Sequence, residues 1–323
     1  FPNRCGRFIG VRMIDHVAIV GAGFSGTLQA INLLRHDGPR ATLIERAPVA
    51  GTGLAYSAAH PSHLLNVRAA NMSAFPDDPD HFSRWLRMQG VVDPAATFVP
   101  RATYGAYLRD LLDQALDRAG DRLILRRGDV VDIVRDGEGV SLTLADGGSI
   151  AADAAVLAVG NLPPHPPPGL DPAALSSARY RGDPWEAGIA DGLGRDDVVL
   201  LIGTGLTMVD IVLLLDAQDF RGRIIALSRR GLLPHRHAAA DPFERIGERP
   251  TGGASALVRA VRTRSAAVGW RNAVDELRPF TQMMWRAAGA AEHARFLRHL
   301  RPWWDVHRHR LAPAVADRIQ ALR

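Results

Sequence analysis

A glycine-rich turn between an apolar run and a helix-like segment constrains the fold of this chain more than any other feature. The apolar run 17–20 leads into Gly21-Ala22-Gly23-Phe24-Ser25-Gly26, and a second apolar run, 41–45, ends in Glu45. In a strand–turn–helix of this type the three glycines permit a tight turn, close approach of a pyrophosphate and close helix–strand packing. The pattern predicts a dinucleotide-binding βαβ unit; the alternative is a glycine-rich turn that only packs.

The position of each residue in this turn suggests a role. Phosphates bind at the start of a helix, where unpaired N–H groups and the helix dipole favour negative charge. Phe24 and Ser25 belong to that helix start. Glu45 is placed to accept hydrogen bonds from ribose hydroxyls, and its carboxylate would repel a 2′-phosphate. This first site is therefore interpreted as an FAD site.

The chain repeats the pattern once more, after residue 196. The mainly apolar run 197–202 leads into Gly203-Thr204-Gly205-Leu206-Thr207-Met208, and the strand expected next, 223–227, is followed by Ser228-Arg229-Arg230. Met208 replaces the third glycine, so helix and strand must stand further apart. Guanidinium groups pair with phosphate bidentately, so a hydroxyl and two arginines at the ribose position favour a 2′-phosphate. The second site is interpreted as an NADPH site; the alternative is a solvated basic turn.

Two dinucleotide units with opposite ribose chemistry indicate a flavoprotein that uses FAD and NADPH. The apolar run 154–159, which closes on Gly160-Asn161, supports this interpretation. In two-dinucleotide flavoproteins such a strand ends the first FAD segment, and its glycine lets the chain pass the cofactor. By itself, the run is also compatible with any buried strand that ends in a turn.

Composition excludes several alternatives. Cys5 is the only cysteine, so the chain cannot run an intramolecular dithiol relay, and one unpaired thiol fits the reducing cytoplasm. All 39 basic residues are arginine, which excludes Schiff-base chemistry and an intact P-loop. The net charge of +5 is modest and the arginines are scattered, so no nucleic-acid surface is expected. No apolar run approaches the roughly 20 residues that span a bilayer, so no membrane segment is expected.

The chain divides at a proline-rich stretch, 162–169, which we expect to be a stiff, extended crossing. Before it, residues 104–116 have helical spacing of apolar residues and 123–160 contain short strands with a turn at 146–148. We therefore expect the first part of an FAD-binding domain at 13–162 and an NAD(P)-binding domain at 163–323. From residue 252 the pattern is mostly helical, with these side chains expected in the core: Trp285, Phe296, Leu297, Leu300, Trp303 and Trp304.

Several segments carry a family resemblance. Gly51-Thr52-Gly53-Leu54-Ala55-Tyr56, His63-Leu64-Leu65-Asn66-Val67, the block 203–210 and Trp303-Trp304-Asp305-Val306-His307-Arg308-His309-Arg310 resemble the bacterial FAD–NAD(P)-binding protein family. The resemblance implies an α/β fold with two Rossmann-like domains, the NADP domain being inserted into the FAD domain, and a helical C-terminal segment. It also implies that the closing FAD strand and helix are missing, so that the chain is truncated at its C-terminus.

A more distant likeness extends to N-hydroxylating flavin monooxygenases. The corresponding positions are His60-Pro61, Met72-Ser73 and Arg101-x-x-Tyr104. Ser73 replaces the glutamine of those enzymes, and the lysine that holds their substrate is absent from 75–78, which argues against an amino-acid substrate held in that way. The motif of Baeyer–Villiger and flavin-containing monooxygenases is not matched either, because 181–185 lacks the expected histidine.

These observations favour an FAD-dependent oxidoreductase that takes hydride from NADPH, most similar to a monooxygenase acting on a small molecule with molecular oxygen. The alternatives are an NADPH–flavin reductase and a non-catalytic nucleotide-binding module. No catalytic residue is assigned. Besides the residues of the two turns, the cofactor-binding candidates are Glu45, Arg46, Asn66, Met72, Arg101, Val130, Gly160, Ser228, Arg229 and Arg230.

The histidines provide further candidates. His60 and His63 lie close in sequence to the proposed flavin-binding segments and are candidates for a functional role. The pairs His235/His237 and His307/His309 have i, i+2 spacing, which does not place both rings on one helical face. No cysteine or carboxylate cluster completes a zinc set, so we expect solvated or packing roles and no metal.

Overall fold

The computed structural model describes residues 13–57, 60–175, 179–186, 188–238 and 243–323. Cys5 therefore lies outside the described residues. The chain divides into two compact units: unit 1 consists of Phe1–Pro61, Met72–Pro94 and Val99–Ala187, and unit 2 of Ser62–Asn71, Ala95–Phe98 and Gly188–Arg323. Each unit is considered separately below.

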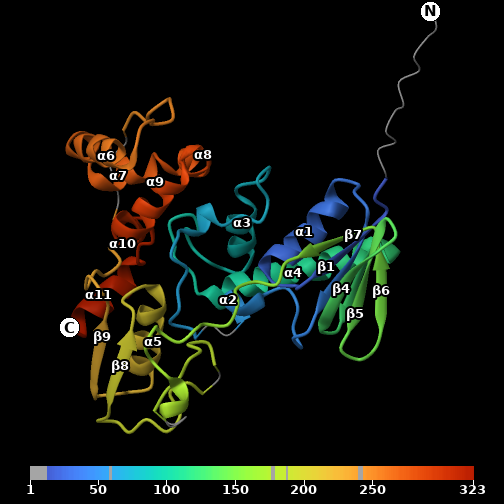
Figure 1. The fold of residues 1–323 in the computed structure, drawn as a ribbon, viewed down its shortest axis with the longest axis horizontal. Helices are drawn as coiled ribbons and strands as arrows, with labels where there is room; N and C mark the ends of the chain where they lie inside the picture. The colour runs from blue at the N-terminus through green and yellow to red at the C-terminus, as the bar shows by residue number, and fades with distance from the viewer. Residues whose placement is uncertain (1–12, 58–59, 176–178, 187, 239–242) are drawn as a thin grey trace, which may run out of the picture. The chain divides into compact units, whose positions relative to one another are not determined.

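Unit 1 is built on a four-stranded parallel sheet in the order β3-β2-β1-β7, of which Figure 1 labels β1 and β7. Its strands are β1 His16–Val20, β2 Arg40–Glu45, β3 Leu123–Arg127 and β7 Ala154–Leu157. In register, Val17 lies opposite Ala41 of β2 on one side and Ala154 of β7 on the other. Since the first strand of the chain lies in the interior of the sheet, the glycine turn that follows it is held between two neighbours.

Alternating residues of β1 face two different layers. Val17 and Ile19 pack against helices α1 Phe24–Arg35 and α4 Arg101–Ala119. Ala18 packs on the other face, against a three-stranded antiparallel sheet of β4 Val130–Asp136, β5 Gly139–Leu144 and β6 Ser149–Ala152. Both faces of the strand are buried, so it is apolar throughout, as expected of parallel sheets covered on both sides.

The remaining elements of unit 1 are short helices. They are α2 Gly53–Ser57, α3 His81–Met88, η2 Gly120–Arg122 and η3 Pro172–Ala174. The aromatic rings of α3 and α4 pack together, with ring centroids of Phe82 and Tyr107 4.7 Å apart, and the Trp85 indole N–H donates to Asp110 at 2.8 Å. The predicted helix 104–116 lies inside α4, and the predicted turn at 146–148 joins β5 to β6, with Gly147 at φ +84°.

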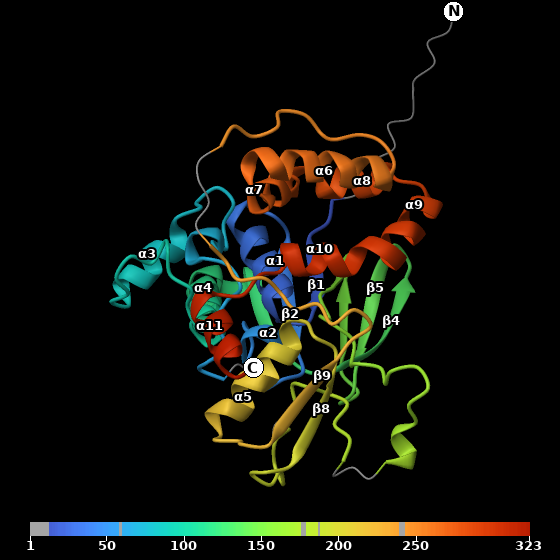
Figure 2. The ribbon, with the colours of Figure 1, turned by 90° about the vertical axis from the view of Figure 1, so that its left-hand side faces the viewer.

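Unit 2 contains a second strand–turn–helix unit. Strands β8 Val198–Ile202 and β9 Arg223–Leu227 pair in parallel, and helices α5 Leu206–Ala217 and α11 Pro313–Ala321 cover one face of the pair (Figure 2). Met208 is buried in the resulting core. The side chains of the opposite strand face are exposed, and those that are more than half exposed are Val198, Leu200, Ile202 and Leu227.

The rest of unit 2 is helical, as predicted for the C-terminal part. Its elements are η1 Ala69–Asn71, α6 Ala254–Val268, α7 Trp270–Asp275, η4 Arg278–Phe280, α8 Thr281–Ala287, α9 Ala290–Arg295, η5 Phe296–Leu300 and α10 Arg301–Arg308. The core expected here was partly wrong, because Trp285, Leu297 and Trp303 are exposed. Short successive helices give each segment few neighbours, and the buried residues lie on α7, α10 and α11 instead.

Candidate dinucleotide-binding sites

The first glycine turn has the backbone geometry that the sequence predicts. Gly21 has φ +98°, and its N–H donates to the Ile44 carbonyl at 2.8 Å, which ties the turn to the end of β2. A Cβ on Gly21 would lie 2.4 Å from the Ala158 carbonyl oxygen. A Cβ on Gly26 would lie 1.8 Å from the Gly21 carbonyl oxygen. Both positions therefore require glycine.

The start of α1 offers backbone donors to an anion. Gly23 is the N-cap residue, and no side chain caps the helix. The first turn of an α-helix has N–H groups without intrahelical partners, which here include those of Phe24 and Ser25, both exposed. A phosphate is well matched to such an uncapped helix start.

Glu45 is held in place by two backbone groups. Its Oε2 accepts from the Ala22 N–H at 2.7 Å and its Oε1 accepts from the Ala47 N–H at 2.8 Å. A carboxylate has about four lone-pair sites, so it keeps acceptor capacity for ribose hydroxyls. These features together fit the adenosine and pyrophosphate portion of FAD.

A second loop lies against this turn and was missed as part of the candidate site. The Gly51 N–H donates to the Ala22 carbonyl at 2.8 Å. Gly53 has φ +58°, and a Cβ on it would lie 2.9 Å from the Gly23 Cα. Thr52 between them is 3% exposed, and its hydroxyl has no hydrogen-bond partner among the described residues. The Gly-x-Gly spacing of 51–53, in the segment that follows β2, is the sequence signal that indicates this close approach.

Phe24 joins an aromatic group beside the turn. Its ring centroid lies 6.2 Å from Tyr56 and 6.3 Å from Tyr104, and those two rings are 4.9 Å apart. Burial raises the pKa of both tyrosines. The phenols therefore remain neutral at physiological pH and provide a rigid apolar wall.

The other first-site candidates in this sheet have simpler surroundings. Arg46 is exposed after β2. Val130 is partly buried and packs against the hydrophobic cluster that contains Ile44 of β2. Gly160 is exposed with φ +73°, the left-handed conformation that its proposed role in redirecting the chain requires.

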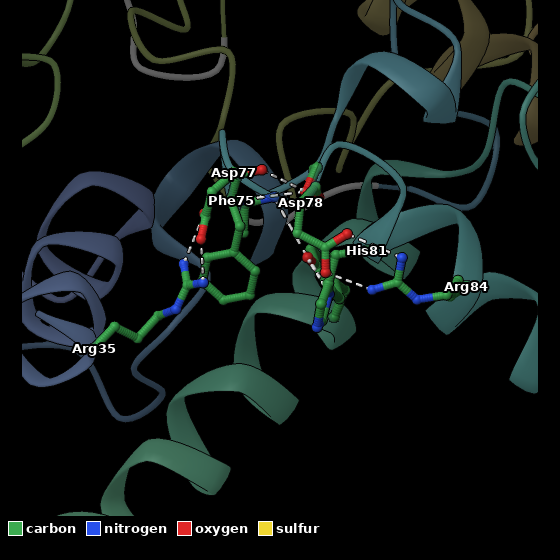
Figure 3. Close-up of polar contacts among 9 residues, drawn as sticks. Arg35, Phe75, Asp77, Asp78, His81 and Arg84 are labelled. Carbon is green, nitrogen blue, oxygen red and sulfur yellow. Dashed lines mark hydrogen bonds and ion pairs between the residues drawn. The ribbon is translucent and has the colours of Figure 1, made fainter.

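Met72 and Ser73 precede a turn that is fixed by ion pairs (Figure 3). The Ser73 hydroxyl accepts from the Phe75 N–H at 3.1 Å and donates to the Asp78 carbonyl at 2.6 Å.

Two arginines pair with the carboxylates of this turn. Arg35 donates to both carboxylate oxygens of Asp77, at 2.8 and 3.2 Å, and Arg84 donates to Asp78 at 2.9 Å. These arginines lower the pKa of both carboxyls. The carboxylates are thus committed to structural pairs in 75–78, the segment that the distant likeness would align with the lysine of N-hydroxylating monooxygenases.

Two candidates carried over by resemblance fall in different units. Asn66 belongs to unit 2, where its carbonyl accepts from His237 Nε2 at 2.8 Å. Arg101 is the first residue of α4 in unit 1, and its charge opposes the burial effect on the pKa of Tyr56. Within unit 1, Arg101 therefore lies near the aromatic group that contains Tyr56.

The second turn repeats the backbone of the first. The Gly203 N–H donates to the Leu227 carbonyl at 2.8 Å, and Gly205 is the N-cap of α5 with φ −86° and ψ −165°, against −74° and −166° at Gly23. A Cβ on Gly203 or Gly205 would meet nothing within 4 Å. The second turn is thus more open than the first, in agreement with Met208 at the third glycine position. Leu206 and Thr207 begin α5 and take the places of Phe24 and Ser25.

Ser228 organises the basic turn after β9. Its hydroxyl accepts from the Gly231 N–H at 3.0 Å and is hydrogen-bonded to the Thr204 hydroxyl at 2.8 Å. Thr204 donates to the Leu232 carbonyl at 2.6 Å, so the proton between the two hydroxyls comes from Ser228. Ser228 thereby fixes the turn, and Arg229 and Arg230 are exposed beside it.

The histidine candidates are held by backbone carbonyls. His63 is buried in unit 2 and its Nε2 donates to the Asp210 carbonyl at 2.9 Å. His307 Nδ1 donates to the Trp303 carbonyl at 2.7 Å, whereas His60 is partly buried in unit 1. In the described part of the chain, no group of three or more His, Cys, Asp or Glu side chains is arranged to hold a metal ion.

The fold and the two turns define an α/β protein with two Rossmann-like strand–turn–helix units. Residues 18–162 match the model of a protein family described as FAD-NAD(P)-binding. The predicted family resemblance is confirmed for these residues, as are FAD and NAD(P) as the class of cofactor. No curated protein sequence matches the chain.

The solved structures found to be similar to this chain have low sequence identity to it. Oxidized steroid monooxygenase bound to NADP is 21% identical, with 79% of this chain and 43% of that chain covered and a TM-score of 0.48. A cyclohexanone monooxygenase mutant from Rhodococcus sp. Phi1 bound to NADP+ is 18% identical, with 79% and 44% covered and a TM-score of 0.47. The chain thus spans less than half the length of these proteins. None of the helices in the described part of the chain has the length and apolar character that a bilayer span requires.

Proposed function

We propose that the chain carries the FAD-binding and NADP-binding parts of an FAD-dependent oxidoreductase that takes hydride from NADPH. The observation that supports this most directly is the repeated turn with opposite charge at its ribose position. Glu45 follows β2 in unit 1, and Ser228 with Arg229 and Arg230 follows β9 in unit 2. A carboxylate favours ribose hydroxyls, whereas guanidinium groups favour a 2′-phosphate.

In this proposal residues 13–162 form the first part of the FAD domain and 163–323 the NADP domain. The N–H groups at the start of α1 bind the FAD pyrophosphate, and Glu45 binds its ribose. The more open turn before α5 binds the NADPH pyrophosphate, and Arg229 and Arg230 bind the 2′-phosphate. FAD supplies the electron-transfer chemistry when bound, while the protein supplies orientation and electrostatics.

The electron acceptor in this proposal is a small molecule together with molecular oxygen, as in a monooxygenase. Support comes from the single cysteine, since a chain with only Cys5 has no intramolecular dithiol to reduce. The same cysteine count supports a cytoplasmic location. The fixed turn 73–78, with Asp77 and Asp78 paired to arginines, argues against a substrate anchored by a lysine there.

The test is an absorbance spectrum of the purified chain with FAD, followed by anaerobic addition of NADPH and of NADH. We expect a bound flavin band that bleaches faster with NADPH than with NADH. Faster bleaching without any effect of a candidate substrate, but with rapid transfer to artificial acceptors, would identify a flavin reductase instead. Bound flavin that neither nucleotide reduces would identify a non-catalytic binding module and contradict the proposal.

A further inference from the structure

Three segments of unit 2 that are distant in sequence meet around Trp270, the first residue of α7. The His235 N–H donates to the Val306 carbonyl at 3.2 Å, and the Leu311 N–H donates to the His235 carbonyl at 2.8 Å. These bonds bring the segment after the basic turn alongside the end of α10. We call the group formed there the Trp270 cluster; its members are Trp270, Arg271, His235, His307 and Arg310.

Three aromatic rings pack together in the Trp270 cluster. The His235 ring centroid lies 4.9 Å from Trp270 and 4.6 Å from His307, and Trp270 lies 4.9 Å from His307. All three side chains are partly exposed, so a small molecule can reach them. His307 Nδ1 donates to the Trp303 carbonyl at 2.7 Å, which fixes the orientation of that ring.

Two of the neighbouring arginines already have carboxylate partners. Arg310 is 5% exposed and donates to both oxygens of Asp275, at 2.9 and 3.1 Å. Arg236 pairs with Asp317 at 2.9 Å. These pairs are neutral as units, while Arg308 adds a further positive charge near Asp275.

Arg271 differs from these arginines because the described residues give it no carboxylate partner. Its guanidinium carbon lies 4.4 Å from the Trp270 ring centroid, and Nη2 donates to the Arg236 carbonyl at 3.2 Å. Its Nε is buried and makes no hydrogen bond to the described residues. Burial and then the charges of Arg310 and Arg236 lower the pKa of Arg271.

A guanidinium without a carboxylate partner that is partly desolvated beside other cations is unfavourable, and a bound anion would relieve the cost. The planar guanidinium fork matches the oxygens of a carboxylate or a phosphate. We propose that Arg271 anchors a binding site for an oxyanion, the carboxylate or phosphate group of a small molecule, with the rings of the Trp270 cluster as its floor. The alternative is that Arg271 only stacks on Trp270.

The site is tested by calorimetric titration of the full chain with inorganic phosphate and, separately, with acetate at constant ionic strength. Charge-assisted hydrogen bonds are strong, so we expect Arg271→Gln to weaken binding of at least one of these ions by about tenfold or more. Arg262→Gln on the exposed face of α6 is the matched control and should bind like the wild type. Failure of the wild type to bind either ion, or equal binding by Arg271→Gln, would overturn the proposal.

A measurement on the wild type keeps the test independent of whether Arg271→Gln folds. Burial and then neighbouring charges, Arg271 among them, lower the pKa of His235, and an oxyanion at Arg271 would favour its protonated form. Saturating phosphate or acetate, whichever ion binds, should therefore raise the pKa of His235, followed by NMR and assigned with His235→Gln. Unchanged titration curves would count against the site.

The oxyanion has two possible sources, which the nucleotides distinguish. If Arg271→Gln weakens binding of NADP+ more than of NAD+, the 2′-phosphate of the cofactor supplies the oxyanion. If both nucleotides bind as before while phosphate or acetate binding is lost, a separate acidic ligand supplies it. The inference does not depend on the proposed oxidoreductase activity, because none of these readouts measures turnover.

Discussion

Ser228 occupies in unit 2 the position that Glu45 occupies in unit 1. Each residue follows the carbonyl that accepts the N–H of the first glycine of its turn, Leu227 for Gly203 and Ile44 for Gly21. Each also bonds the residue after that glycine: Glu45 accepts from the Ala22 N–H and Ser228 bonds the Thr204 hydroxyl. The two units therefore share one turn geometry and differ in the charge presented to a ligand.

Replacement of Glu45 by glutamine should weaken FAD binding. The amide keeps one oxygen for the Ala22 N–H but turns its NH2 group toward the Ala47 N–H, and it loses the negative charge. Hydrogen bonds to charged groups contribute about 1.5–3 kcal/mol, so we expect the dissociation constant for FAD to rise by about 10- to 100-fold. Flavin fluorescence titration measures it.

The control for this change is Glu138→Gln at an exposed turn of the antiparallel sheet. It removes the same charge from unit 1 at a distance from the glycine turn and should leave FAD affinity unchanged. Equal losses in both variants would show that net charge, and not the Glu45 contacts, determines the affinity.

The glycines of the two turns should respond differently to alanine. In Gly26→Ala the new Cβ collides with the Gly21 carbonyl, and we expect a loss of at least about 3 kcal/mol in the free energy of unfolding. Gly205→Ala has open space and an ordinary φ, so we expect a loss of about 1 kcal/mol or less. Urea denaturation of both variants measures the difference, and similar losses would contradict the assignment of a tight first turn.

Substitutions in the basic turn should distinguish the residues that select NADPH over NADH from the residue that holds the backbone of the turn. Arg229→Gln with Arg230→Gln should reduce the preference for NADPH over NADH by about tenfold or more, since each phosphate contact is charge-assisted. Ser228→Ala removes the hydrogen bond to the Gly231 N–H and should weaken the binding of NADPH and NADH to a similar extent. Arg259→Gln on α6 is the exposed control. The dissociation constants of each variant for NADPH and NADH measure these effects. An unchanged ratio of the two constants in the double variant would refute the NADPH assignment.

His16 should make unit 1 less stable in acid. Burial, followed by the charge of Arg40, lowers its pKa below the ordinary value of 6.5. As the pH falls, the unfolded chain therefore takes up the proton first. The stabilisation is complete above about pH 6.5 and is lost progressively below it. We expect the free energy of unfolding to fall between pH 7 and pH 5, with a smaller fall in His16→Gln; equal slopes would count against this prediction.

The pair Arg264–Glu276 should be important for the stability of unit 2. The Glu276 side chain is 2% exposed and accepts from Arg264 Nε at 3.0 Å. Arg264→Met leaves a buried carboxylate without its partner, so we expect a loss of about 3–5 kcal/mol. Arg295→Met breaks an exposed pair with Glu292 and should cost about 0–1 kcal/mol. Thermal unfolding compares the stability of Arg264→Met with that of Arg295→Met. The double variant Arg264→Met/Glu276→Met should recover most of the stability that Arg264→Met loses.

Local patterns in the sequence predicted the parts of the fold that depend on local constraints. The positive φ of Gly21 and Gly203 and the uncapped helix starts follow from short-range steric requirements of the glycine turns. Both faces of β1 are buried, and the sequence shows this as a run of apolar residues at 17–20 without alternating polar positions. For the same reason the position of Glu45, one residue after the strand carbonyl that holds Gly21, could be predicted.

Long-range packing could not be predicted in this way. Trp303 and Leu297 lie in a segment with a mostly helical pattern, yet they are exposed because a helical pattern does not specify which helix faces pack against a neighbour. Among the described residues, the Thr52 hydroxyl has no hydrogen-bond partner and the Arg271 guanidinium has no carboxylate partner. Both features depend on contacts between segments that are distant in sequence. No local signal distinguishes Arg271 from the other arginines of the chain. The Gly-x-Gly spacing around Thr52 indicates the close approach of its loop but not the missing partner of its hydroxyl.

The approach of Gly53 to Gly23 limits how this protein can be altered. Surface loops usually accept insertions and larger residues. Here a single methyl group at position 53 would press on the Cα of Gly23, and the Gly51 N–H is tied to Ala22. A designer who lengthened the segment after β2 would push the start of α1 out of place. The segment 51–53 should therefore be kept at fixed length in any circular permutation, domain insertion or affinity-tag scheme.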